Sequence, residues 1–230
     1  PNTQVTALES SIRAVLPATK SSAAKRLEGN LDEKLKLLTG FQTSPDFVNL
    51  DPKFREEVNL AAQEIRAYQK LGEEIKRGDW PVRLITREED LAVLEKFLAA
   101  TRPPDEFAEL WPETELVKRL EERGREARAL RQAVTEEEAW FKDQIKLGKD
   151  LQKQGGAIIA GLASPVERAQ WFGQVKEFLA REPRYKAGDR LPGVPSVTFG
   201  NVYQFRQVDT ARKDWEGFKR KLEDLKKQVP

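Results

Sequence analysis

Apolar side chains recur at alternating intervals of three and four residues through most of this chain, and this rhythm limits the folds open to it. The clearest run contains Phe54, Val58, Ala61, Ile65, Tyr68, Gly72 and Ile75. Such spacing draws one narrow apolar stripe along an α-helix, as in coiled coils and long helical bundles. It predicts a mainly α fold: an elongated, coiled-coil-rich helical bundle of six or seven helices.

The longest helix is expected over residues 113–154, which contain no proline. One apolar stripe runs through this segment: Leu116, Leu120, Ala127, Leu130, Val134, Phe141, Ile145, Gly148 and Leu151. A continuous helix of this length would extend about 60 Å at about 1.5 Å per residue. Thr135 and Glu138 also have the spacing of a capping box, so a break at Thr135 is the alternative.

Helix-starting signals are strongest at Asp51-Pro52 and Ser164-Pro165, where an N-cap acceptor precedes proline at the first helical position. The first of these helices is expected to end at Gly78, and Glu167 completes a capping box in the second. Further helices are expected over 5–15, ended by Pro17; over 24–38, closed by Gly40; over 91–101, opened by Thr86 and Glu89; and over 211–229, capped by Asp209.

The least polar window of the chain is residues 155–163, which begin with the pair Gly155-Gly156. The glycine pair is expected to end the long helix and to permit a reversal of the chain. The simpler interpretation buries the large apolar side chains of this window at the end of the bundle. The alternative is an exposed tip that docks into a partner or a membrane surface, although the window is too short to span a membrane. The side chains concerned are Ile158, Ile159 and Leu162.

Helical periodicity disappears between Arg184 and Gln207. β-Branched and aromatic residues surround Gly200-Asn201, a dipeptide typical of a two-residue turn, so we expect a small β-hairpin near residues 196–207. Aromatic and arginine side chains in this segment are of the types enriched in binding hot spots, and burial against a helical end is the alternative. The candidate partner-binding residues are Tyr185, Arg190, Phe199, Tyr203, Phe205 and Arg206.

The sequence Arg102-Pro103-Pro104 interrupts the helical pattern between two halves of the chain. We expect an N-terminal helical unit over 1–102. A second unit over 103–230 would hold the long helix and its hairpin partner, the β-hairpin and the C-terminal helix. One continuous domain is the alternative.

Missing residue types exclude several kinds of chemistry. The chain contains no Cys and no His, which removes thiol nucleophiles, thiolate metal sites and the commonest general base. Gly156 and Gly161 have the spacing of a phosphate-binding loop, but Leu162-Ala163 stand where Lys and Ser or Thr are required. We therefore expect no enzyme, no catalytic residue, no metal site and no cofactor. Because the chain has 38 acidic residues, a carboxylate-dependent hydrolase is kept as the third hypothesis.

The last helix carries a basic face beside an aromatic seam. The simpler interpretation is a solvated bundle helix whose lysines favour its C-terminal dipole. The alternative is a contact for anionic lipid, RNA or an acidic partner. The residues of this basic face are Arg212, Lys213, Lys219, Arg220, Lys221, Lys226 and Lys227.

Taken together, these features favour a non-catalytic structural or interaction protein. It would act as a helical adaptor, spacer or assembly subunit, binding other proteins or its own copies through heptad seams. The runner-up is a peripheral membrane- or nucleic-acid-binding protein that uses the basic C-terminal helix. That alternative is weaker because 40 basic and 38 acidic residues nearly cancel, so no strong overall field attracts an anionic partner.

The chain also lacks Met, so no sulfur side chain is open to oxidation. A GC-rich coding bias explains this composition most simply, and an envelope or exported location is slightly favoured over the cytoplasm. Because position 1 is proline, we expect either removal of an initiator methionine or a processing boundary ahead of Pro1.

Overall fold

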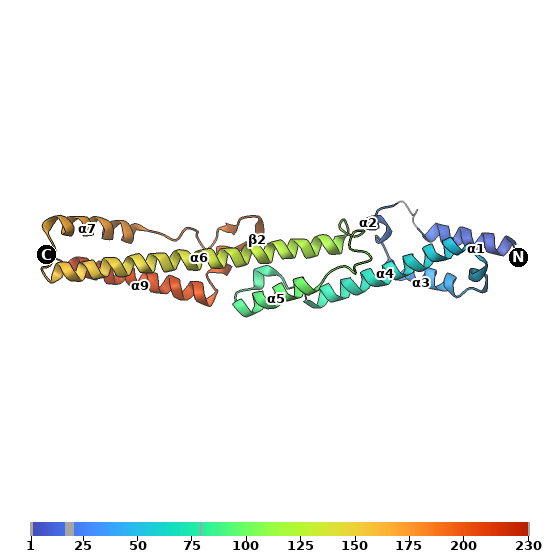
Figure 1. The fold of residues 1–230 in the computed structure, drawn as a ribbon, viewed down its shortest axis with the longest axis horizontal. Helices are drawn as coiled ribbons and strands as arrows, with labels where there is room; N and C mark the ends of the chain where they lie inside the picture. Colours follow the sequence, from blue (N-terminus) through green and yellow to red (C-terminus); the bar gives the residue numbers. More distant parts are fainter. Residues whose placement is uncertain (1, 17–20, 79, 230) are drawn as a thin grey trace. The chain divides into compact units, whose positions relative to one another are not determined.

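The structure, a computed structural model, describes residues 2–16, 21–78 and 80–229. As expected, it is mainly α-helical (Figure 1). The described ranges hold nine α-helices, two of them four residues long, and one two-stranded antiparallel sheet. They form two compact units: unit 1 is Pro1–Asp79 with Leu94–Gly124, and unit 2 is Trp80–Val93 with Arg125–Pro230.

Unit 1 is built on a helix whose buried stripe matches the apolar rhythm of the sequence. Its elements are α1 (Asn2–Val15), α2 (Ala23–Arg26), α3 (Leu31–Gln42), the 3₁₀ helix η1 (Pro45–Asn49) and α4 (Pro52–Gly78). The second half of α5 (Glu88–Ala100) and the start of α6 (Glu115–Ile159) complete it. Helix α3 packs against α4, and α1 packs against α3 and η1. The core residues of α4 include Phe54, Val58, Ile65, Tyr68 and Ile75.

The predicted start of α4 is confirmed, because Asp51 Oδ1 accepts hydrogen bonds from the backbone N–H groups of Lys53 (2.9 Å) and Phe54 (3.3 Å). The helix ends at Gly78, also as predicted. Helix α1 ends at Val15, and Pro17, which we expected to end it, lies outside the described residues.

The single helix expected over 24–38 is wrong, because the chain breaks there into α2 and α3. Between them Gly29 has φ +85°, a left-handed conformation that an α-helix does not contain. Asn30 then caps α3 by accepting a hydrogen bond from the Glu33 N–H at 3.1 Å. Helix α3 also continues through Gly40, which we expected to close it, and ends at Gln42.

Unit 2 contains the 3₁₀ helix η2 (Val82–Leu84), the first part of α5, most of α6, α7 (Pro165–Ala180), β1 (Arg190–Leu191), β2 (Val194–Thr198), α8 (Phe199–Val202) and α9 (Arg206–Gln228). Helices α7 and α9 pack against each other, and aromatic side chains join both to α6. Trp140 and Trp215 make an edge contact at 5.4 Å between α6 and α9. Trp171 of α7 donates a hydrogen bond to the Leu151 carbonyl of α6 at 2.7 Å.

Helix α6 is continuous through Thr135, so the predicted long helix is confirmed without the break. The Thr135 hydroxyl turns back along the helix and donates to the Arg131 carbonyl oxygen at 3.0 Å. This back-bond satisfies the hydroxyl without interrupting the helix. The capping-box spacing at this point therefore has no structural effect.

The prediction that Gly155-Gly156 ends α6 is wrong, because the helix continues to Ile159. Gly155 serves packing instead: a Cβ there would overlap Leu225 and lie 2.6 Å from Cζ2 of Trp171. The reversal occurs at Gly161, whose φ is +74°. The Leu162 N–H donates to the Ala157 carbonyl oxygen at 3.0 Å. This bond spans five residues, as in the Schellman motif that ends many helices at a glycine.

Helix α7 starts at the predicted capping box. Ser164 Oγ accepts from the Glu167 N–H at 3.2 Å, and Glu167 Oε2 accepts from the Ser164 N–H at 2.7 Å. These hydrogen bonds favour the ionised carboxylate and lower the pKa of Glu167.

A small antiparallel hairpin exists, but its predicted position near 196–207 is wrong. The strands are β1 and β2, joined by Pro192-Gly193, where Gly193 has the positive φ (+73°) that such turns require. Gly200-Asn201 lies in α8 instead. There the Gly200 N–H donates to the Ala187 carbonyl oxygen (2.7 Å), and Asn201 Nδ2 donates to that of Arg83 (2.6 Å).

The last helix begins earlier than predicted. Helix α9 starts at Arg206, so Asp209 lies in its first turn and is not its N-cap. Asp209 pairs there with Lys213 at 2.6 Å and with Arg212 at 3.4 Å. The hydrogen bond from Lys213 makes the largest contribution to lowering the pKa of Asp209.

Candidate functional site

Unit 1 contains an open groove of about 910 Å³ along one face of α4. Residues from α1, α2, α3 and the turn at 106–110 form its walls. On α4 the lining residues recur every three to four positions: Lys53, Phe54, Glu57, Leu60, Ala61, Glu64 and Ile65. Twelve residue steps of helix correspond to about 18 Å, so the groove follows α4 for roughly three turns.

The floor of the groove is apolar, and two leucine side chains that line it are about half exposed to solvent. Leu38, Phe54 and Ile65 are buried in the core beneath it. Leu60 of α4 and Leu110 of the turn remain 52% and 53% exposed. Both lie in one concave surface, which sets them apart from apolar side chains exposed singly on the protein surface.

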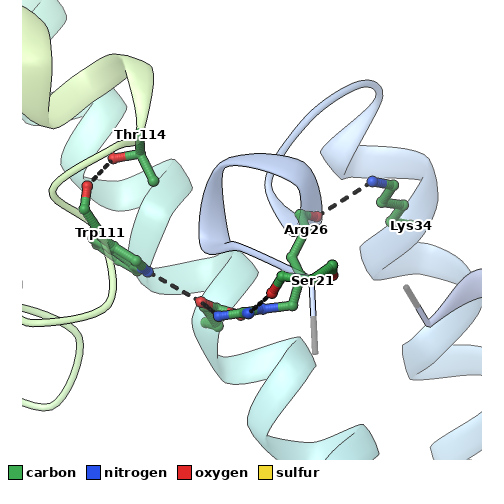
Figure 2. A network of polar contacts seen from close by, with 6 residues as sticks. Ser21, Arg26, Lys34, Trp111 and Thr114 are labelled. Atoms are coloured by element: carbon green, nitrogen blue, oxygen red, sulfur yellow. Dashed lines mark hydrogen bonds and ion pairs between the residues drawn. The ribbon is translucent and has the colours of Figure 1, made fainter. Parts of the chain in front are cut away.

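A buried polar network holds the walls of the groove together (Figure 2). The Glu64 carboxylate accepts two hydrogen bonds from Arg26, from Nη2 at 2.8 Å and from Nε at 3.1 Å. It accepts a third from Trp111 Nε1 at 3.1 Å. Arg26 Nη1 also donates to the Ser21 carbonyl oxygen at 2.5 Å. The network thus joins α2, α4 and the segment before α6 at one carboxylate.

Both oxygens of the Glu64 carboxylate accept hydrogen bonds: Oε1 accepts from Arg26 Nη2 and from Trp111, and Oε2 accepts from Arg26 Nε. Glu64 is only 6% exposed. Its arrangement suits a structural anchor and not a general base, which needs a free oxygen directed at a substrate.

Aromatic packing fixes the segment that carries Leu110. The rings of Phe107 and Trp111 stack at 4.9 Å, and Tyr68 of α4 meets Trp111 edge-on at 5.3 Å. Thr114 Oγ1 donates to the Trp111 carbonyl oxygen at 2.7 Å. Trp111 is fully buried. The turn beside the groove is therefore anchored at its base, while Leu110 points out of the core.

Helix α6 presents a second set of buried polar side chains, this time in unit 2. They are 11 and 7 residues apart, so they fall on one helical stripe: Glu126, Glu137 and Gln144. Each contacts the segment between α7 and α9. Ser196 donates to Glu126 at 2.8 Å, Tyr203 lies 3.3 Å from Glu137, and Arg181 donates to Gln144 at 2.7 Å. This stripe positions the largely non-helical 181–203 segment on α6.

The apolar residues after the glycine pair divide between core and surface. Ile158 is 4% exposed, whereas Ile159 and Leu162 are 44% and 80% exposed. Val166 in the first turn of α7 is also exposed. Full burial of this window is therefore wrong for Ile159 and Leu162, and their role as a docking tip stays a prediction.

Most candidate residues of the 184–207 segment belong to the core of unit 2. Phe199, Tyr203 and Phe205 are buried, and Tyr185 stacks on Phe199 at 4.0 Å. For these aromatic side chains the structure favours the packing alternative over direct partner contact. The exposed candidates of this segment are Arg190 and Arg206.

The basic face of α9 is largely engaged within unit 2. Lys219 donates to the Arg181 carbonyl oxygen at 2.6 Å and lies over the Trp215 ring at 4.6 Å. Lys227 pairs with Asp224 at 3.2 Å. Lys221 lies over Phe218 at 5.1 Å, and Lys213 pairs with Asp209. These contacts fit the solvated-helix interpretation, and Arg220 and Lys226 are exposed.

Sequence reasoning did not find the groove. Leu60 lies off the apolar stripe of α4, between Val58 and Ala61, and an apolar residue outside a regular stripe was the available signal. Leu110 follows Phe107 by three residues, a spacing that does not distinguish a buried side chain from an exposed one. The exposure of both leucines depends on contacts between segments that are distant in the sequence, and a local pattern holds no information on such contacts.

The described ranges lack two features of other functional classes, a cluster of metal-ligating side chains and a membrane-spanning helix. No group of three or more acidic side chains has the arrangement of a metal site. No described helix combines the length and the apolar composition needed to cross a bilayer. In comparisons with known proteins, no family model, no curated protein and no solved structure matches the chain.

Proposed function

We propose that this chain is a non-catalytic interaction protein that receives the apolar face of a partner helix in the groove of unit 1. The observation that carries the proposal is the pair of exposed leucines, Leu60 and Leu110, in one groove of about 910 Å³. Exposed apolar side chains within one concave surface are a common feature of binding sites.

The dimensions of the groove support a helix as the occupant. About three turns of α4 line it, and a partner helix of similar length would offer apolar residues at positions i, i+3 or i+4, and i+7. Such a helix would meet a floor that is already ordered, because the network at Glu64 and the stacked Trp111 fix the surrounding segments. Preorganised walls lower the cost of binding.

The proposal predicts that the groove selects amphipathic helices from a mixture. A displayed library of peptides of about four turns, roughly 14 residues, would be selected on the full chain. Enriched peptides should carry apolar residues on one helical face and should compete with one another. Leu60→Asp and Leu110→Asp should each weaken binding at least about tenfold, the effect of about 1.4 kcal/mol.

Leu37→Asp is the matched control, because Leu37 is 43% exposed on α3 of the same unit and does not line the groove. Circular dichroism would verify that all three variants remain folded. If no peptide is enriched, or if Leu37→Asp weakens binding as much as the groove variants do, the proposed function is wrong.

A further inference from the structure

We infer that the helix recognised by the groove is basic on its polar face, a conclusion that rests on the proposed function. The groove contains both signs of charge, so the inference depends on which of them are already paired. Its acidic lining residues are Glu9, Asp51, Glu57, Glu64 and Glu106, and its basic ones are Arg13, Arg26, Lys34 and Lys53.

Two of the four basic lining side chains are paired with carboxylates, and a third is held by backbone carbonyl oxygens. Arg13 pairs with Glu9 at 2.8 Å and lies over the Phe54 ring at 4.6 Å. Arg26 is held by Glu64. Lys34 Nζ donates to the carbonyl oxygens of Glu28 at 2.6 Å and Arg26 at 3.3 Å. The carboxylates neutralise Arg13 and Arg26, whereas the carbonyl contacts leave the charge of Lys34 uncompensated, like that of Lys53.

The remaining acidic side chains stand beside the exposed leucines. Glu57 precedes Leu60 by about one turn of α4, and Glu106 precedes Leu110 by four residues. Both glutamates are exposed, and within the described ranges neither forms an ion pair. Glu106 accepts a hydrogen bond from Gln63 at 3.1 Å, which leaves its charge uncompensated.

At one end of the groove Asp51 adds a third carboxylate, although its side chain also caps α4. The opposing charge at this end of the groove is Lys53, two residues after Asp51 in the sequence. Glu57 and Glu106 are thus the lining carboxylates nearest in sequence to Leu60 and Leu110, whereas the uncompensated cations Lys34 and Lys53 lie on α3 and at one end of the α4 face. A helix that inserts apolar residues at Leu60 and Leu110 would place its flanking polar positions against Glu57 and Glu106, where Lys or Arg is favoured.

Two synthetic peptides test this inference. Both would have the same apolar face and the same length of about four turns, roughly 14 residues. One would carry Lys and Arg at the polar positions, the other Glu and Asp. Fluorescence anisotropy on the full chain should show the basic peptide binding about tenfold more tightly at low salt, because several exposed pairs each contribute modestly. The difference should shrink in high salt.

The double variant Glu57→Lys/Glu106→Lys should abolish or reverse the preference for the basic peptide. Its matched control is Glu56→Lys/Glu109→Lys, which makes the same charge change at exposed neighbours that do not line the groove. The control should keep most of the preference.

The outcomes separate the two proposals. If both peptides bind with equal affinity and Leu60→Asp abolishes both, the groove binds helices but the inference of a basic partner is wrong. Tighter binding of the acidic peptide, or equal loss of preference in the control variant, also overturns the inference. If neither peptide binds better than a scrambled one, the proposed function itself fails.

Discussion

The phenolic oxygen of Tyr203 lies 3.3 Å from Oε2 of Glu137 and 2.6 Å from the carbonyl oxygen of Tyr185. A phenol has a single proton, and the shorter contact shows that Tyr203 donates it to the carbonyl of Tyr185. Glu137 is 1% exposed, and its other oxygen has no hydrogen-bond partner within the described residues. The contact with Glu137 is then the weaker of the two, so the buried carboxylate of Glu137 has little hydrogen bonding to favour its charged form.

The surroundings of Glu137 in unit 2 disfavour its charged form. Burial raises the pKa of Glu137 most, and the negative charge of Glu136 adds to this effect. The hydrogen bond with Tyr203 and the positive charge of Arg184 oppose it in part. Burial also raises the pKa of Tyr203, with a further contribution from Glu137, so the phenol stays neutral. The positive charge of Arg212 lowers the pKa of Tyr203, and the negative charge of Asp189 raises it.

We predict that Glu137 makes the stability of unit 2 pH-dependent. A carboxyl whose pKa is raised by folding stabilises the native state fully below its unfolded pKa, about 4.3. It loses that contribution as pH rises through the folded pKa. The free energy of unfolding of the wild type, relative to that of Glu137→Gln, should fall as pH rises above about 4. Urea unfolding at several pH values measures this difference.

Glu137→Ala provides the control, because it removes the partner of Tyr203 and leaves a cavity. It should lower the free energy of unfolding by about 1–3 kcal/mol, whereas Glu137→Gln keeps a neutral polar group in place. A wild-type stability that rises relative to Glu137→Gln between acid and neutral pH would show that folding lowers the pKa of Glu137, contrary to the prediction.

We predict opposite effects for alanine at the two adjacent glycines of α6. A Cβ at Gly155 would overlap Leu225, so Gly155→Ala should destabilise unit 2 by about 1–3 kcal/mol. A Cβ at Gly156 meets no atom within 4 Å, so Gly156→Ala should stabilise the helix by up to about 1 kcal/mol. Chemical denaturation of both variants measures the difference. Equal stability of the two would contradict the close packing at Gly155.

We predict that the two arginine–glutamate pairs of the groove differ in importance. Arg26→Ala leaves the buried Glu64 charge without its cation and should cost about 3 kcal/mol of unfolding free energy. Arg13→Ala breaks an exposed pair with Glu9 and should cost less than about 1 kcal/mol. Denaturant titration of both variants is the test, and similar losses would mean that the Glu64 network does not anchor the groove.

We predict that the turn between α6 and α7 tolerates change at Leu162 and not at Ile158. Leu162 is 80% exposed, so Leu162→Ala should alter the free energy of unfolding by less than about 0.5 kcal/mol. Ile158 is buried, and Ile158→Ala should cost about 2–4 kcal/mol. Thermal unfolding compares the two variants. A large loss at Leu162 would mean that another part of the chain covers it.

Elements set by local chemistry could be predicted from the sequence. Asp51 and Ser164 start helices because their side chains accept backbone N–H groups within three residues, whatever the rest of the chain does. The unbroken apolar stripe likewise predicted that α6 continues through Thr135. These signals act over one or two helical turns, so distant contacts did not override them.

Glycine-containing pairs were misjudged because their role depends on what packs against them. Gly155-Gly156 looks like a helix end, but Trp171 and Leu225, far away in sequence, need the space that Gly155 leaves. Gly200-Asn201 looks like a hairpin turn, but the hydrogen bond of Asn201 to the Arg83 carbonyl depends on a segment 118 residues away. The true turn at Pro192-Gly193 was an equally valid local signal.

The groove could not be predicted from the sequence, for the same reason. Leu60 and Leu110 are exposed because the surrounding core closes without them, and Glu64 joins segments that are 38 and 47 residues away. Composition correctly indicated that helices with one buried face would dominate the fold. It could not indicate which face would stay partly uncovered.

The most direct test of the central claim is methyl NMR of the leucine-labelled full chain during titration with the basic amphipathic peptide. The methyl signals of Leu60 and Leu110 should shift together and saturate, while those of Leu37, which is also exposed on the same unit, should stay unchanged. Saturable binding that leaves Leu60 and Leu110 unshifted, or shifts Leu37 by as much, would contradict a helix-binding groove on α4.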